Sequence, residues 1–155
     1  MPIKVFFMGN PLLGDDGIGP HLYSELKEEK RLGNIELHDA GSAGLNLISL
    51  IDDGDRIIIV DAIISKESKE DIGNVMAIDE KDICHEIPAV SAHDIGLGQT
   101  IRLIREYAKE IPPIKIIGIT AKHIGNSPKL SREIKKNMEK IKEDVVRKIL
   151  EASAD

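Results

Sequence analysis

Residues 3–19 of this chain are Ile-Lys-Val-Phe-Phe-Met-Gly-Asn-Pro-Leu-Leu-Gly-Asp-Asp-Gly-Ile-Gly. The apolar segment at 3–8 predicts a buried strand. It leads into a turn rich in glycine, a residue that adopts backbone angles closed to others. The turn presents two adjacent carboxylates, Asp15 and Asp16, where a nucleotide-binding loop carries Lys and Ser or Thr. These carboxylates would repel phosphate, so the turn favours a cation.

The rest of the chain alternates between strand and helix patterns. Apolar runs predict further strands at 35–38, 56–60, 74–78 and 114–118. A helical period occurs at 18–31, 44–52, 94–109 and 129–152, and the last of these carries an apolar stripe of Ile134, Met138, Ile141, Val145 and Leu150. This alternation predicts an α/β sandwich.

One connection departs from the alternation. Residues 62–72 are polar and too irregular for a crossover helix. A strand reached without such a crossover can run antiparallel to its neighbour. We therefore expect a mixed five-stranded sheet in which the strand at 74–78 is antiparallel.

Length, charge and cysteine usage restrict the class of protein. A chain of 155 residues predicts a single domain, 1–155. The net charge of −6 argues against a nucleic-acid partner, and no apolar run reaches the roughly 20 residues that span a bilayer. Cys84 is the single cysteine and residues 1–20 lack the pattern of a signal peptide. We therefore expect a cytoplasmic protein that does not enter a membrane.

Polar residues follow several of the predicted strands. In open α/β sheets, ligand sites form beyond the carboxyl ends of the parallel strands. The candidate segments there are Asp15-Asp16, His38-Asp39-Ala40-Gly41-Ser42, Asp61-Ala62 and Ser91-Ala92-His93-Asp94. Asp16, Asp61 and His93 would supply two carboxylates and one imidazole. This set suits nickel, zinc or another late first-row divalent ion and leaves positions open for a substrate.

Asp15 and Asp16 also have simpler interpretations, whereas Asp61 is harder to dismiss. Asp15 is assigned to the cap of the helix that begins at residue 18, a common use of Asp. A helix start attracts carboxylates in any case, so Asp16 has a structural explanation too. Asp61 directly follows the apolar run 56–60, where an unpartnered buried carboxylate would be costly, so it needs a partner or a metal.

The histidines and the cysteine are weaker candidates when taken one at a time. His93 alone is typical of a helix start or a surface, with Ser91 as the neighbouring cap, and it gains weight only beside Asp16 and Asp61. Structural interpretations are favoured for His38, His85 and His123, although His123 follows the last strand and could face the same crevice. Cys84 has no Cys or His at a metal-binding spacing, so it is interpreted as structural.

Residues 9–19 carry a resemblance to a known family. Gly-Asn-Pro-Leu-Leu-Gly-Asp-Asp-Gly-Ile-Gly resembles Gly-Asn-x-Leu-x-Gly-Asp-Asp-Gly-x-Gly, the signature of the hydrogenase maturation proteases. The segments 39–44, 61–62 and 91–93 follow in order, and each is similar to a block of that family. The resemblance implies a three-layer α/β/α fold with one antiparallel strand.

The same resemblance implies an activity and a partner. It implies a hydrolase, an endopeptidase that removes a short carboxyl-terminal peptide from the precursor of a nickel-iron hydrogenase large subunit after nickel insertion. Asp16, Asp61 and His93 take the family's metal positions and recognise nickel that the precursor carries. A bound divalent ion can polarise a carbonyl or acidify water. Alternatively Asp16 or Asp61 acts as a general base, as in an aspartyl type of endopeptidase.

One segment departs from the family pattern. Many members continue with Gly-Ile-Glu-Pro after the last strand, whereas Gly118-Ile119 is followed here by Thr120-Ala121-Lys122. This difference bears on the specificity for one hydrogenase and leaves Asp16, Asp61 and His93 unchanged.

Two alternative functions are kept. The first is a receiver-type signalling domain phosphorylated on Asp61, with Asp15, Asp16 and Lys122 in the places of the receiver's other acidic and lysine residues. Receivers, however, usually carry their acidic pair directly at the end of the first strand, and they have no use for a residue such as His93. The second is a non-catalytic module of hydrogenase assembly that binds metal through the same three residues.

Overall fold

The computed structural model describes residues 2–41, 45–64, 71–80 and 95–154. Within these residues the strands form one sheet in the order β2-β1-β3-β5-β4. The bounds are β1 (Ile3–Met8), β2 (Glu36–Gly41), β3 (Arg56–Ile63), β4 (Val75–Asp79) and β5 (Ile114–Thr120). All neighbouring pairs are parallel except β4 with β5, which is antiparallel. The mixed five-stranded sheet with an antiparallel strand near 74–78 is therefore confirmed.

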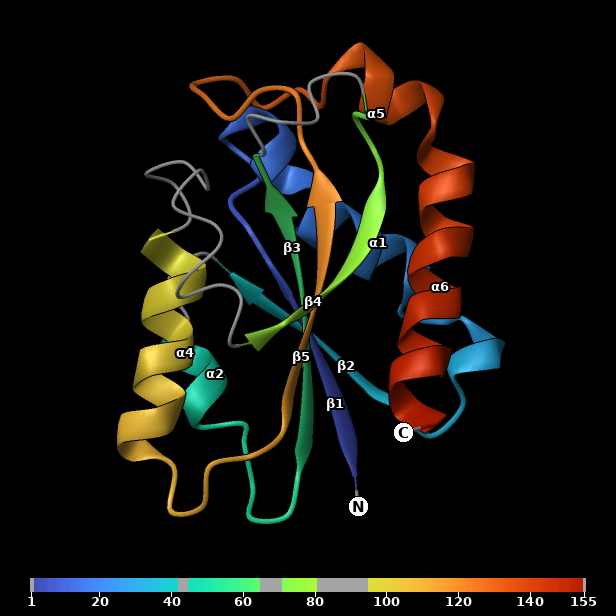
Figure 1. Cartoon of the computed structure of the whole chain (residues 1–155). Helices are drawn as coiled ribbons and strands as arrows, with labels where there is room; N and C mark the ends of the chain where they lie inside the picture. The colour runs from blue at the N-terminus through green and yellow to red at the C-terminus, as the bar shows by residue number, and fades with distance from the viewer. Residues whose placement is uncertain (1, 42–44, 65–70, 81–94, 155) are drawn as a thin grey trace.

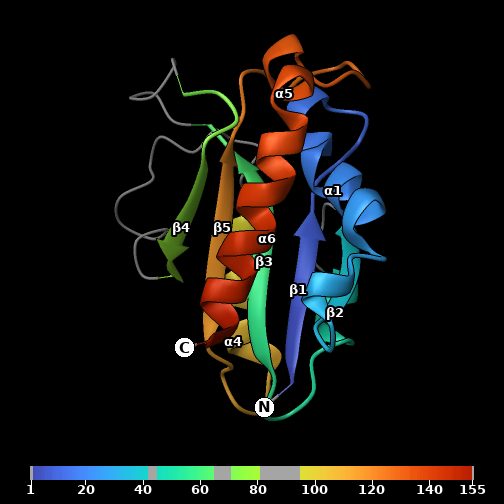
Figure 2. The same ribbon diagram turned by 90° about the vertical axis from the view of Figure 1, so that its right-hand side faces the viewer.

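Helices cover both faces of the sheet (Figures 1 and 2). Helices α1 (Ile18–Leu26) and α6 (Met138–Ala154) lie on one face, and α2 (Leu45–Ile48) and α4 (Ile95–Tyr107) lie on the other. A short helix, α5 (Arg132–Lys136), precedes α6, and two 3-10 turns, η1 (Gly14–Gly17) and η2 (Lys30–Leu32), flank α1. This arrangement is the predicted three-layer α/β/α sandwich.

The two faces of the sheet build two apolar cores. Alternate residues of a strand point to opposite faces, so Phe7 and Val60 pack towards α1 and α6. Phe6 and Ile59 pack towards α2 and α4. All four side chains are fully buried. Burial of side chains of this size stabilises the fold by about 1.5–3 kcal/mol each.

The helix boundaries differ from the sequence expectations in three places. The helix expected at 18–31 ends at Leu26, and the one expected at 44–52 is reduced to α2. The segment 129–152 forms two helices, α5 and α6, because Asn137 leaves the helical conformation between them. Of the predicted stripe, Leu150 is wrong: it is 39% exposed, whereas the neighbouring Ile149 is fully buried.

Strands β2 and β3 are longer than predicted, and this changes the position of two candidate segments. Residues 39–41 lie inside β2 rather than beyond it, and Asp61 lies inside β3, paired with Gly118 of β5. Strand pairing extends these segments past their apolar runs.

None of the helices in the described ranges is long and apolar enough to cross a bilayer.

Candidate active site

The sheet order predicts a ligand site between β1 and β3. From β1 the chain moves outward to β2 on one side, whereas β3 and β5 lie on the other side. Such a reversal of strand order leaves an opening at the carboxyl ends of the two central strands. The 3-10 turn η1 follows β1 at this edge and contacts β3. Asp16 lies on this turn, and Asp61 lies near the carboxyl end of β3.

Two glycines allow the turn to pack closely against the end of β1. Gly9 has a φ of +140°, and a Cβ atom there would lie 1.9 Å from the carbonyl oxygen of Asp16. A Cβ on Gly19, in the first turn of α1, would lie 1.9 Å from the carbonyl oxygen of Met8. Only glycine permits both approaches. The glycine pattern seen in the sequence therefore determines where Asp16 is held.

The carboxylates of Asp16 and Asp61 are both buried at this edge. Asp16 is 8% exposed, and its Oδ2 accepts a hydrogen bond of 2.8 Å from the backbone N–H of Asn10. Asp61 is 5% exposed, and its Oδ1 accepts one of 2.8 Å from the N–H of Ala62. Backbone donors thus orient two oxygen ligands of the kind that bind divalent cations.

The third predicted ligand cannot be placed beside them. His93 lies outside the described residues, as do Ser91, Cys84 and His85. Within the described ranges, no three His, Cys, Asp or Glu side chains form a group that could hold an ion. The structure therefore brings the elements that carry Asp16 and Asp61 together, and the place of His93 stays a prediction.

The cap assigned to Asp15 is wrong. Neither η1 nor α1 has a side-chain cap, and the N-cap residue of α1 is Gly17. The Asp15 carboxylate instead accepts backbone hydrogen bonds from Lys122 at 2.9 Å, His123 at 3.2 Å and Ser131 at 2.6 Å. Asp15 is 1% exposed. It therefore ties the glycine-rich turn to the loop between β5 and α5.

Two of the three described histidines, His38 and His123, were considered as site candidates, and they lie in different surroundings. The ring of His38 stacks on Phe6, with 5.2 Å between ring centroids, and its Nε2 lies 3.3 Å from a carboxylate oxygen of Glu36. This contact supports the structural interpretation of His38. His123 is exposed and lies in the loop that Asp15 holds.

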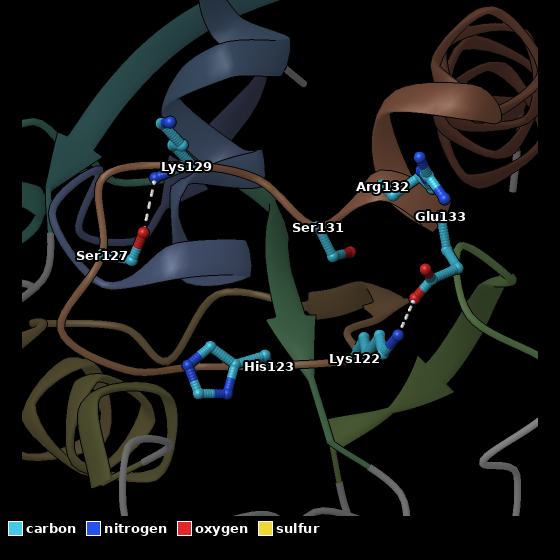
Figure 3. Close-up of a pocket in the computed structure, with 7 residues that line it drawn as sticks. All are labelled: Lys122, His123, Ser127, Lys129, Ser131, Arg132 and Glu133. Carbon is cyan, nitrogen blue, oxygen red and sulfur yellow. Dashed lines mark hydrogen bonds and ion pairs between the residues drawn. The ribbon is translucent and has the colours of Figure 1, made fainter.

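A pocket of about 430 Å³ opens beside this loop (Figure 3). Its lining residues are Lys122, His123, Ser127, Lys129, Ser131, Arg132 and Glu133. Lys122 and Glu133 point towards each other, with 2.8 Å between the ammonium nitrogen and a carboxylate oxygen. The pocket lining thus contains three cationic side chains, one imidazole and one carboxylate.

Sequence reasoning missed this pocket, although a signal was present. Residues 122–136 contain five Lys and Arg and one acidic residue, in a chain with 27 acidic and 21 basic residues. The local excess is visible in the sequence. What could not be seen is that Asp15, from the other end of the chain, folds the segment against the candidate site.

Comparison with known proteins identifies relatives along nearly the whole chain. The sequence profile of the hydrogenase maturation protease family matches residues 20–148, a range that begins just after the glycine-rich motif. The Hydrogenase 2 maturation protease of Escherichia coli (strain K12) is 30% identical over 151 residues, which cover 91% of this chain and 88% of the relative.

Solved structures give the same result. The nickel-iron hydrogenase maturation protease HybD from Thermococcus kodakarensis superposes with a TM-score of 0.75 and 27% identity, covering 95% of this chain and 98% of the other. The hydrogenase maturating endopeptidase HybD from E. coli also gives a TM-score of 0.75 at 27% identity, covering 98% and 94% of the two chains.

Proposed function

This chain belongs to the hydrogenase maturation protease family and is an endopeptidase, and we propose that it recognises nickel in the precursor of a nickel-iron hydrogenase large subunit and then removes a short carboxyl-terminal peptide. The nickel is cargo of the substrate. Asp16, Asp61 and His93 are the residues that contact it. The reaction takes place in the cytoplasm, a location supported by the lone Cys84.

One observation carries the proposal. The turn that holds the buried Asp16 contacts the strand that holds the buried Asp61, at the point where the order of the parallel strands reverses. Carboxylate oxygens are ligands that a divalent first-row ion accepts. Nickel with remaining ligands supplied by the precursor would fit these two carboxylates, because it accepts mixed oxygen, nitrogen and sulfur ligands.

The chain's own residues perform binding and orientation. The N–H groups of Asn10 and Ala62 fix the two carboxylates before the substrate arrives. A carboxylate fixed in this way next to a peptide bond can also accept a proton from the attacking water. That role corresponds to the aspartyl type of endopeptidase.

The test is cleavage of the purified large-subunit precursor from the same organism, prepared with and without nickel. Wild type should shorten only the nickel-loaded precursor, as read by mass spectrometry. Asp16→Asn, Asp61→Asn and His93→Ala should each lower the cleavage rate by about 100-fold or more. Asp53→Asn, an exposed residue before β3, is the matched control and should cleave normally.

Binding of the precursor separates recognition from chemistry. A variant that still binds the nickel-loaded precursor but does not cleave it has lost a proton acceptor. One that no longer distinguishes nickel-loaded from nickel-free precursor has lost a metal contact. Cleavage of both precursors at equal rates by wild type would contradict recognition of nickel.

The same assay examines the two alternative functions. A wild type that binds nickel-loaded precursor without shortening it would be an assembly module. The receiver interpretation has lost support, because Lys122 pairs with Glu133 at 2.8 Å and the relatives are proteases.

A further inference from the structure

The loop between β5 and α5 concentrates positive charge beside the candidate active site. Lys122, Lys129 and Arg132 line one pocket of about 430 Å³. The chain as a whole has a net charge of −6. A cationic pocket on an acidic protein is a local feature with its own electrostatic field, and such fields attract anionic groups.

The backbone that carries these cations is fixed in place. Asp15 accepts the N–H of Lys122 at one end of the loop and that of Ser131 at the other. The N–H of Asp15 in turn donates a hydrogen bond of 2.8 Å to the carbonyl oxygen of His123. Because Asp15 and Asp16 are adjacent, the pocket is anchored one residue from a proposed nickel contact.

The positive charge of the pocket is only partly neutralised. Glu133 forms an ion pair with Lys122 at 2.8 Å. In the part of the chain that the structure describes, neither Lys129 nor Arg132 has a carboxylate partner. An arginine and a lysine at the wall of one pocket can bind a carboxylate through charge-assisted hydrogen bonds.

We propose that this pocket binds acidic side chains of the precursor polypeptide and thereby positions its cleavage segment. The inference rests on the proposed function, because Asp15 ties the pocket to the turn that carries Asp16. The net negative charge of the whole chain opposes a nucleic acid as the occupant. Exposed charges mainly change how fast a partner associates, and salt screens them. The pocket therefore contributes to substrate association more than to the chemical step.

Steady-state cleavage of the nickel-loaded precursor tests this role. Lys129→Glu and Arg132→Glu should each raise KM about fivefold at low ionic strength and leave kcat within about twofold. The increase should shrink in 0.5 M salt, a concentration at which the Debye length is only about 4 Å. Glu133→Gln, which releases Lys122 from its partner, should lower KM.

Lys136→Glu is the matched control. Lys136 is an exposed cation of the same segment and is not part of the pocket lining, and the substitution changes the net charge by the same amount. Its KM should stay within about twofold of wild type. Equal KM values for Lys129→Glu and Lys136→Glu would overturn the proposal. Thermal unfolding by circular dichroism identifies any variant that fails to fold, and Arg132→Gln then replaces Arg132→Glu.

A direct binding measurement separates failure of the inference from failure of the proposed function. The probe is a fluorescein-labelled peptide of alternating Gly and Glu, compared with its Gly and Gln counterpart by fluorescence anisotropy. Wild type should bind the acidic peptide, and Arg132→Glu should bind it about tenfold more weakly. If wild type binds the acidic peptide but does not cleave the precursor, only the proposed function fails. If wild type cleaves the precursor but binds the Glu and Gln peptides equally well, only the proposed role of the pocket fails.

Discussion

The carboxylate of Asp15 accepts a hydrogen bond of 2.6 Å from the backbone N–H of Ser131, a residue 116 positions further along the chain. The same carboxylate accepts the N–H groups of Lys122 and His123. One buried side chain therefore joins the first turn of the fold to the loop that precedes the last two helices. The pocket and the candidate active site share this connection.

Asp15→Asn should destabilise the protein by about 2–4 kcal/mol, because hydrogen bonds to a buried charged group are each worth about 1.5–3 kcal/mol. Asparagine has one carbonyl oxygen, and its NH2 group would face backbone donors. The free energy of unfolding in urea measures the effect. Asp39→Asn, at an exposed aspartate of β2, should change it by less than 0.5 kcal/mol. A similar small change for Asp15→Asn would contradict the role of Asp15.

Gly19→Ala should prevent folding or cost at least about 3 kcal/mol, because the new methyl group would lie 1.9 Å from the carbonyl oxygen of Met8. Gly98 in α4 is the control, since a Cβ atom there meets nothing within 4 Å. Gly98→Ala should stabilise the helix by about 0.5–1 kcal/mol. Thermal melting of both variants provides the comparison, and equal melting temperatures would refute the close packing of η1 and α1 on β1.

Thr120→Val should stabilise the protein by about 1 kcal/mol, because the Thr120 hydroxyl is buried and has no hydrogen-bond partner in the described structure. Valine keeps the shape and removes the unsatisfied polar atom. Thr100→Val is the matched control: Thr100 is equally buried but has an interaction partner, so its substitution should destabilise. If urea midpoints fall for both variants, the Thr120 hydroxyl stabilises the fold and the prediction is wrong.

The buried pair of Lys4 and Asp55 predicts how stability depends on pH. Their charged atoms lie 2.8 Å apart, and Lys4 also binds Asp52 at 2.9 Å. Burial by itself lowers the pKa of Lys4 and raises that of Asp55, but hydrogen bonds outweigh it. The pKa of Lys4 is therefore raised above 10.5, and the pKa of Asp55 is lowered below 3.8.

The two shifts act at opposite ends of the pH range. A lowered pKa stabilises the folded state above the ordinary value of 3.8, and this stability is lost as pH falls below it. The raised pKa of Lys4 stabilises the folded state at pH values below the ordinary pKa of 10.5. This stability is lost as the pH rises through the pKa of Lys4 in the folded state. Asp55→Asn should lower the free energy of unfolding by about 2 kcal/mol at neutral pH. It should also flatten the acid limb, the part of the profile in which stability falls as the pH is lowered.

Urea midpoints between pH 3 and pH 8 measure this dependence. Asp53→Asn, an exposed neighbour, should keep the wild-type profile. An acid limb that is equally steep in wild type and Asp55→Asn would show that other carboxylates dominate acid unfolding.

Local patterns in the sequence predicted most of the sheet correctly. The strand at 3–8 was predicted with its observed bounds, and the antiparallel direction of 74–78 followed from an irregular connection. The glycine pattern at 9–19 indicated a tight turn because close backbone approach is a local requirement. Helix ends were less accurate. Asn137 divides the last helical segment, and the apolar period of 129–152 continues through it without a break.

The sequence by itself determined the α/β sandwich, the family and the candidates Asp16 and Asp61, because apolar runs, glycines and carboxylates are properties of neighbouring residues. Only the tertiary structure decided the partners of Asp15 and the cationic pocket. Residue 131 donates to Asp15 across a separation of 116 residues, and no local pattern encodes such a contact. Burial creates the demand for three donors on Asp15, and the folded sheet determines which loop supplies them.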